Sequence, residues 1–200
     1  MLRIKTARHA VGIPARSLAI AWAALPASAA DGPTAIRLPD TGRFPENVTS
    51  LADGTLFVSI IADGGVLRIA GGVATATPSV KPGEHGKRST FGLLADERRG
   101  TLWVASHDAI AIVAPRPTPT EGGWSKAFDL ASGTLKLSLR LPGGKALSND
   151  FALDGDGALY VTDTLAPRIL RLKPGATLLS ASSRDGREAP SFHLRSADVE

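Results

Sequence analysis

Three short segments of the chain repeat one pattern: a glycine turn followed by leucine, an aromatic residue and valine. They are "DGTLFVS", "RGTLWVAS" and "DGALYVTDT". Aromatic and β-branched residues that follow a tight turn, with partial alternation of polarity, predict strands buried between neighbouring layers. The turn glycines Gly54, Gly100 and Gly157 stand 46 and 57 residues apart. A strand-rich period of about 40 to 50 residues predicts the four-stranded blades of a β-propeller.

The predicted fold class is therefore all-β, with the repeated segments 56–59, 102–106 and 159–163 expected as the inner strands of successive blades. The longer second interval has a cause in "APRPTPTEGG", a loop rich in proline and glycine, followed by a hairpin that turns at residues 131–133. A β-sandwich is the alternative fold, but it does not require one segment to recur at blade spacing. The chain has no cysteine, which excludes a disulfide framework and a cysteine-based zinc site.

Residues 1–29 have the composition of a secretory signal peptide. Four basic residues precede an apolar run, Leu18 to Leu25, that is too short to span a bilayer, and Ala27-Ser28-Ala29 offers small residues at a cleavage site. The alternative is an amphipathic or membrane-anchoring helix. The signal peptide predicts a periplasmic or secreted protein that has no membrane association after cleavage.

Removing this segment changes the charge of the chain. The full sequence has 23 Lys and Arg against 19 Asp and Glu, and the four basic residues of the leader account for the whole excess. The remaining 19 residues of each sign form no basic run. Nucleic acid is therefore not an expected partner, because affinity for phosphate depends on clustered Lys and Arg.

The segments "FPENVTSLADGTLFVS", "FGLLADERRGTLWVAS" and "KAFDLASGTLKLSLRLPGGKALSNDFALDGDGALYVTDTLAPRILRL" resemble the superfamily of senescence marker protein, gluconolactonase and luciferin-regenerating enzyme. The resemblance covers roughly residues 44–175. It implies a six-bladed propeller that binds a divalent cation, calcium or zinc, at the mouth of the central channel. Many members hydrolyse lactones or related esters, so a small lactone or ester is the implied substrate.

The resemblance assigns two metal ligands in this chain. Glu46 in "FPENV" is similar to the glutamate from the first blade, and Asn149 in "SNDFALD" is similar to an asparagine that opens the innermost strand of a later blade. Carboxylate and amide oxygens suit hard cations. The alternatives are an ordinary loop carboxylate for Glu46 and a plain Asx turn for Asn149 and Asp150. A second role for Asp150 is that of an acceptor behind the ligands.

Three further polar residues are candidates for the channel mouth. His85 in "GEHGK" and His107 in "ASHDA" lie in predicted loops, where exposed histidines without a metal are the commoner case. Asp163 in "VTDT" ends a predicted strand, and a capping or turn role is expected for it.

The chain also departs from the superfamily pattern. Thr90 and Phe91 stand where metal-binding members often carry an asparagine, and the aspartate that serves as ligand and base comes from a blade beyond Gly175. The 171 residues after the leader supply three to four of six blades. We therefore expect a truncated propeller over residues 30–180, an irregular tail over 181–200 and no identifiable catalytic residue. The open edges of such a propeller are expected to associate with other chains.

Two functions follow. The first is an exported, gluconolactonase-like, metal-dependent lactonase or esterase, in which the cation polarises a carbonyl and acidifies a bound water. The alternative is a non-catalytic periplasmic propeller fragment, or a module that binds a ligand or partner.

Overall fold

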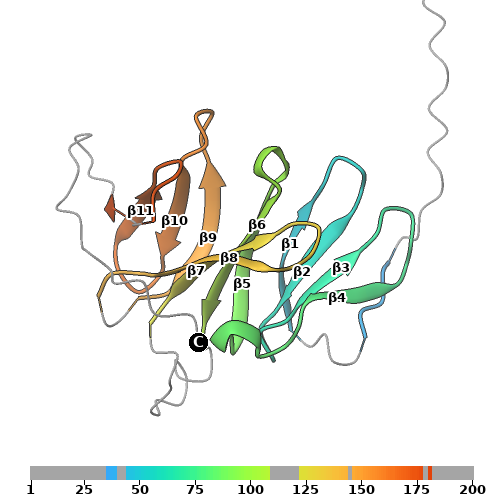
Figure 1. Cartoon of the computed structure of the whole chain (residues 1–200). Helices are drawn as coiled ribbons and strands as arrows, with labels where there is room; N and C mark the ends of the chain where they lie inside the picture. Colours follow the sequence, from blue (N-terminus) through green and yellow to red (C-terminus); the bar gives the residue numbers. More distant parts are fainter. Residues whose placement is uncertain (1–34, 40–43, 109–121, 144–145, 178–179, 182–200) are drawn as a thin grey trace, which may run out of the picture. The chain divides into compact units, whose positions relative to one another are not determined.

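The computed structural model describes residues 35–39, 44–108, 122–143, 146–177 and 180–181. These residues form three four-stranded antiparallel sheets in chain order (Figure 1). Sheet 1 contains β1 (Pro45–Ser50), β2 (Leu56–Ile60), β3 (Val66–Ile69) and β4 (Ala76–Val80). Sheet 2 contains β5 (Ser89–Asp96), β6 (Thr101–His107), β7 (Trp124–Asp129) and β8 (Leu135–Arg140). Sheet 3 contains β9 (Ser148–Leu153), β10 (Leu159–Asp163), β11 (Arg168–Leu172) and β12 (Ser180–Ala181).

Two short 3₁₀ helices stand beside sheet 2. η1 (Glu84–Gly86) precedes β5, and η2 (Glu97–Arg99) connects β5 to β6. In the described part of the chain, no helix is long and apolar enough to cross a membrane. The predicted signal peptide lies outside the described residues, as does the predicted tail apart from Ala181, which belongs to β12.

The repeated segments form β2, β6 and β10, as the sequence predicts, and the turn before each depends on its glycine. Gly157 has φ +85°, a backbone conformation that is strained in residues with a side chain. Its N–H donates a hydrogen bond to the carbonyl of Asp154 at 3.0 Å. The carboxylate of Asp154 accepts hydrogen bonds from the N–H groups of Asp156 and Ala158. Asp154, two residues before the repeat begins, and Gly157 therefore close the turn together.

The prediction that these segments are the innermost strands is wrong. In each sheet the repeated strand is second in order, and it follows β1, β5 or β9. β1 contacts β5 and β5 contacts β9, so these first strands connect the sheets along their inner side. The local pattern of the repeat reflects burial on both faces, which the second strand also has, and it does not identify the strand nearest the axis.

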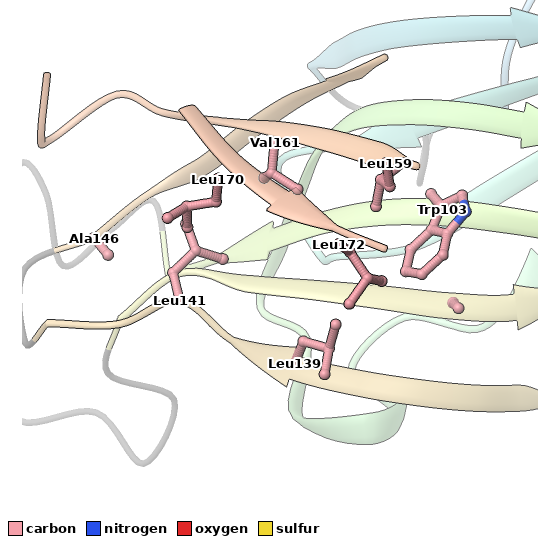
Figure 2. Close-up of a cluster of buried hydrophobic side chains, with 9 residues drawn as sticks. Trp103, Leu139, Leu141, Ala146, Leu159, Val161, Leu170 and Leu172 are labelled. Carbon is pink, nitrogen blue, oxygen red and sulfur yellow. The ribbon is translucent and has the colours of Figure 1, made fainter. Parts of the chain in front are cut away.

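Apolar side chains fill the spaces between consecutive sheets. The cluster between sheets 2 and 3 contains Trp103 from β6 together with Leu159 and Leu170 from sheet 3 (Figure 2). A second cluster between sheets 1 and 2 includes Phe57 and Leu93. The interiors of the fold are thus interfaces between sheets, and each sheet is stabilised by its neighbour.

A buried threonine also connects sheets 1 and 2. The Thr90 hydroxyl accepts a hydrogen bond from the N–H of Ile60 at 2.9 Å, and it lies within donating distance of the carbonyls of Ile60 and Gly65. Between sheets 2 and 3, a buried hydrogen bond joins the hydroxyls of Ser125 and Ser148 at 3.0 Å. Polar groups therefore connect neighbouring sheets at both interfaces, beside the apolar clusters.

Candidate functional site

The three inner strands carry the same irregularity at the same place. In sheet 1 the pairing passes from Pro45 to Val48 while the partner strand advances by only two residues, which leaves one extra residue in β1. β5 and β9 show the same offset. Because β-bulges redirect side chains, this end of the inner strands is a candidate site. The bulged pairs are Glu46 and Asn47 in β1, Phe91 and Gly92 in β5, and Asn149 and Asp150 in β9.

The two predicted ligands therefore occupy equivalent positions, each the first residue of its bulge. Phe91 has this place in the middle sheet, where the resemblance implies an asparagine in other members. Its side chain is buried and offers no metal ligand. Sheet 2 consequently contributes no oxygen side chain to the bulge positions.

Glu46 and Asp150 are close enough for their charges to interact. Partial burial is the largest cause that raises the pKa of Glu46 above its ordinary value, and the negative charge of Asp150 raises this pKa further. No cation relieves this repulsion, since neither carboxylate forms a salt bridge within the described residues. The structure thus brings the carboxylate of β1 toward the bulge of β9.

Gly92 allows the inner strands to approach one another at this point. A Cβ atom on Gly92 would lie 2.2 Å from the carbonyl oxygen of Asn149 and 2.7 Å from the Cα of Asp150. A side chain is therefore excluded by backbone atoms, which cannot move aside easily. A hydrogen bond also joins β5 to sheet 1: the N–H of Leu93 donates to the side-chain oxygen of Asn47 at 3.1 Å.

The other predicted polar residues have different places. His85 is exposed in η1, as expected, and its ring lies 5.7 Å from that of Phe128. The prediction that His107 lies in a loop is wrong, because it ends β6 and is buried, with an Nδ1 atom that has no hydrogen-bond partner among the described residues. Asp163 accepts from the N–H of Leu147 and pairs with Arg168 at 2.8 Å, so its role is structural.

A cavity of about 300 Å³ lies at the opposite end of the inner strands, between sheets 2 and 3. Trp103 and Leu159 contribute to its apolar wall. Two cationic side chains of its lining are already paired, Arg99 with Asp96 at 2.9 Å and Lys136 with Asp129 at 3.1 Å. We therefore assign it no ligand.

A catalytically inactive virginiamycin B lyase from Staphylococcus aureus, with quinupristin, has a similar fold. The TM-score is 0.54 and the sequence identity 13%, and the match covers 80% of this chain and 59% of the lyase. A selenomethionine-substituted form of virginiamycin B lyase from the same organism matches with 15% identity and a TM-score of 0.50, over 79% of this chain and 43% of that chain. The chain has the fold of a partial β-propeller. It spans about half the length of these solved propellers.

A gluconolactonase from Xanthomonas campestris also matches, with 15% identity and a TM-score of 0.46, over 68% of this chain and 45% of that one. The two lyase matches confirm the propeller fold that the sequence predicts. No family model matches the chain, and no curated protein matches its sequence.

The donor chemistry of the bulges fits a hard divalent cation in kind, since two mutually repelling carboxylates and an amide are available. The number of donors is small. The described residues contain no group of three or more His, Cys, Asp or Glu side chains that could hold a metal ion. Any cation at this end of the propeller would therefore need water for most of its ligands.

Proposed function

We propose that the bulge end of the inner strands binds a divalent cation weakly and, through it, the carbonyl oxygen of a small lactone or ester. The equivalent bulge positions of Glu46 and Asn149 on the inner strands support this proposal most directly, and the charge of Asp150, which contributes to the raised pKa of Glu46, adds to it. Two carboxylates without a cationic partner gain stability when a cation is placed between them. Asn149, at the first position of the same bulge as Asp150, supplies a neutral oxygen donor.

Calcium or zinc bound there would polarise the carbonyl and acidify a bound water. The residues of this chain would hold the cation and the ligand. The resemblance of the sequence to the gluconolactonase superfamily is consistent with a lactone as the ligand, although a shared fold alone does not assign the reaction.

A second candidate is binding without turnover. The observation that favours it is the composition of the bulges, where the middle sheet offers only Phe91 and Gly92. No third carboxylate or histidine joins Glu46 and Asp150 among the described residues to serve as a base. The small number of polar side chains at the bulges therefore supports the alternative, a non-catalytic, ligand-binding propeller in the periplasm.

Calorimetric titration with calcium and with zinc tests cation binding. We expect weak binding that falls at least several-fold in Glu46→Gln and in Asn149→Ala, with no change in Asp156→Asn, which alters an exposed turn carboxylate away from the bulges. Tight binding that neither variant weakens would place the site elsewhere. Hydrolysis of simple lactones with each added cation then separates the two candidates, because only the first predicts turnover.

A further inference from the structure

The three sheets form an array in which equivalent positions repeat from sheet to sheet. The face of sheet 1 that points away from sheet 2 is the first face of this array, and the face of sheet 3 that points away from sheet 2 is the last face. Both can be compared with the two interfaces between the sheets. Val48, Leu93 and Phe151 are equivalent, since each pairs with the central valine of the second strand of its sheet. Leu93 packs against sheet 1 and is 4% exposed. Val48, on the same face of sheet 1, is 60% exposed. The first face of the array thus has the pattern of an interface without a neighbouring sheet.

The last face shows the same pattern. Val66 of β3, Ser125 of β7 and Ile169 of β11 are equivalent in register. Val66 and Ser125 have no exposed surface, whereas Ile169 is 47% exposed. Tyr160 is equivalent to Phe57 and Trp103, the aromatic residues of the repeat that fill the interfaces inside the array, and it is only partly buried.

Propellers hold four to eight blades around the axis. The described residues of this chain form three sheets, and the only multiple of three in that range is six. Two copies can therefore complete a ring in which sheet 3 of each copy packs against sheet 1 of the other. Such a ring has two-fold symmetry, the commonest symmetry of protein oligomers.

We propose that two copies of this chain associate head to tail through these faces and close a six-sheet ring. Within one chain, the Asn47 side chain accepts a hydrogen bond from the N–H of Leu93. Between the copies, we expect the equivalent hydrogen bond from the N–H of Val48 in the second copy to the side chain of Asp150. The occupant is a copy of this chain because its first sheet presents the face that the repeat already packs against.

Most of the apolar first face is covered in the single chain, where Val58, Ile60, Leu67 and Ile69 are only 1–8% exposed. Ile36 and Leu38 pack on the cluster formed by Val58, Ile60, Leu67 and Ile69. Within the described structure, residues 35–39 make apolar contacts with the sheet and no hydrogen bond to it. In the ring, sheet 3 of the second copy displaces this short segment.

A disulfide scan tests the contact directly, because the chain has no cysteine of its own. We expect Val48→Cys with Asp150→Cys to form a covalent dimer on mild oxidation, seen by non-reducing electrophoresis and by intact mass. The matched control is Asn47→Cys with Leu93→Cys, the equivalent pair within one chain, which should close inside the monomer. Each single-cysteine variant should form no covalent dimer.

The mass in solution provides the second measurement. Light scattering at micromolar concentration, without added metal, should give twice the chain mass for the unaltered protein and the single mass for Ile169→Arg. Val73→Arg, which adds the same charge at an exposed turn of sheet 1, should leave the double mass unchanged. A monomer in which the two engineered cysteines remain free overturns the proposal. A ladder of higher multimers overturns it as well, since the contact would then form an open chain and no ring.

Discussion

Lys126 of β7 occupies the position that Leu170 occupies in β11. Each is paired across the sheet with a buried valine of the second strand, Val104 or Val161. Lys126 is 5% exposed, and its ammonium group donates to the Ser138 hydroxyl at 2.7 Å and lies 4.8 Å from the centre of the Trp124 ring. No carboxylate pairs with it in the described structure, so a charge is buried where the repeat places a leucine.

Lys126→Leu should stabilise the protein. Burying an ammonium group without a carboxylate costs free energy that a leucine does not. We expect an increase of about 1–3 kcal/mol in the free energy of unfolding, measured by urea denaturation. Lys81→Leu, at an exposed lysine, is the control and should change stability by less than about 0.5 kcal/mol. A loss of stability in Lys126→Leu would show that the contacts with Ser138 and Trp124 outweigh the desolvation of the charge.

Stability should also rise with pH above 8. Burial lowers the pKa of both Lys87 and Lys126 from 10.5 to about 8. Between these values the unfolded chain binds more protons than the folded one, so raising the pH favours the folded state. Urea midpoints should therefore be higher at about pH 9.5 than at about pH 7.5. The increase should be smaller in Lys126→Leu, and an unchanged midpoint in the parent protein would contradict the assignment.

The repulsion between Glu46 and Asp150 predicts a particular titration. The pKa of Glu46 lies above its ordinary value because of burial and the neighbouring charge. Asp150→Asn removes the charge and should lower this pKa, which carboxyl-carbon NMR of the metal-free protein can follow. Because only ionised Glu46 can bind a cation, affinity should weaken as the pH falls through this raised pKa, and in Asp150→Asn the weakening should begin at lower pH. A Glu46 titration that is identical in both proteins would contradict the interaction of the two carboxylates.

Gly92→Ala should destabilise the contact between sheets 2 and 3. Its Cβ would meet the Asn149 carbonyl at 2.2 Å, so the two backbones must separate. We expect a loss of about 1–3 kcal/mol, as for overpacked interiors. Gly155→Ala is the matched control, since no atom lies within 4 Å of its added Cβ and its φ is not positive. Equal stability of the two variants in thermal unfolding would contradict the close approach of β5 and β9.

Cleavage of the leader remains a prediction from the sequence. Small residues at Ala27 and Ala29 suit a signal peptidase, so the exported protein should begin at Ala30 or Asp31. Mass spectrometry of the protein from the periplasm or medium measures this directly. Finding Met1 on the protein, or replacement of Ala29 by a bulky residue without effect on processing, would contradict a secretory leader.

The sequence predicts the strands of the repeat well because burial and turn chemistry are local properties. It does not predict their order from the axis, since that depends on contacts such as that of Gly92 with Asn149, between residues far apart in the chain. The burial of His107 has the same origin: its strand continues further than the alternation in "ASHDA" indicates.

For the candidate site, Glu46 and Asn149 come from the resemblance and are placed by the structure at equivalent bulge positions. The interaction of Asp150 with Glu46 is not predicted, because it arises from the packing of inner strands. A signal is nevertheless present in the sequence. Glu46 and Asn149 each stand eight residues before the turn glycine of their repeat, Gly54 or Gly157, and Phe91 stands nine residues before Gly100.

The Thr90 hydroxyl has a consequence for how this chain unfolds. It bridges to Ile60 and Gly65 of sheet 1, and the side chains of Asn47 and Thr49 accept hydrogen bonds from β5. Among the described residues, fewer side-chain hydrogen bonds join sheets 2 and 3, such as the one between the Ser125 and Ser148 hydroxyls. In a repeat array, the cooperativity of unfolding depends on the coupling between neighbouring units. Sheets 1 and 2 thus form the more tightly coupled pair. Sheet 3 is the unit that can detach alone, and its backbone amides would exchange with solvent before those of the other two sheets.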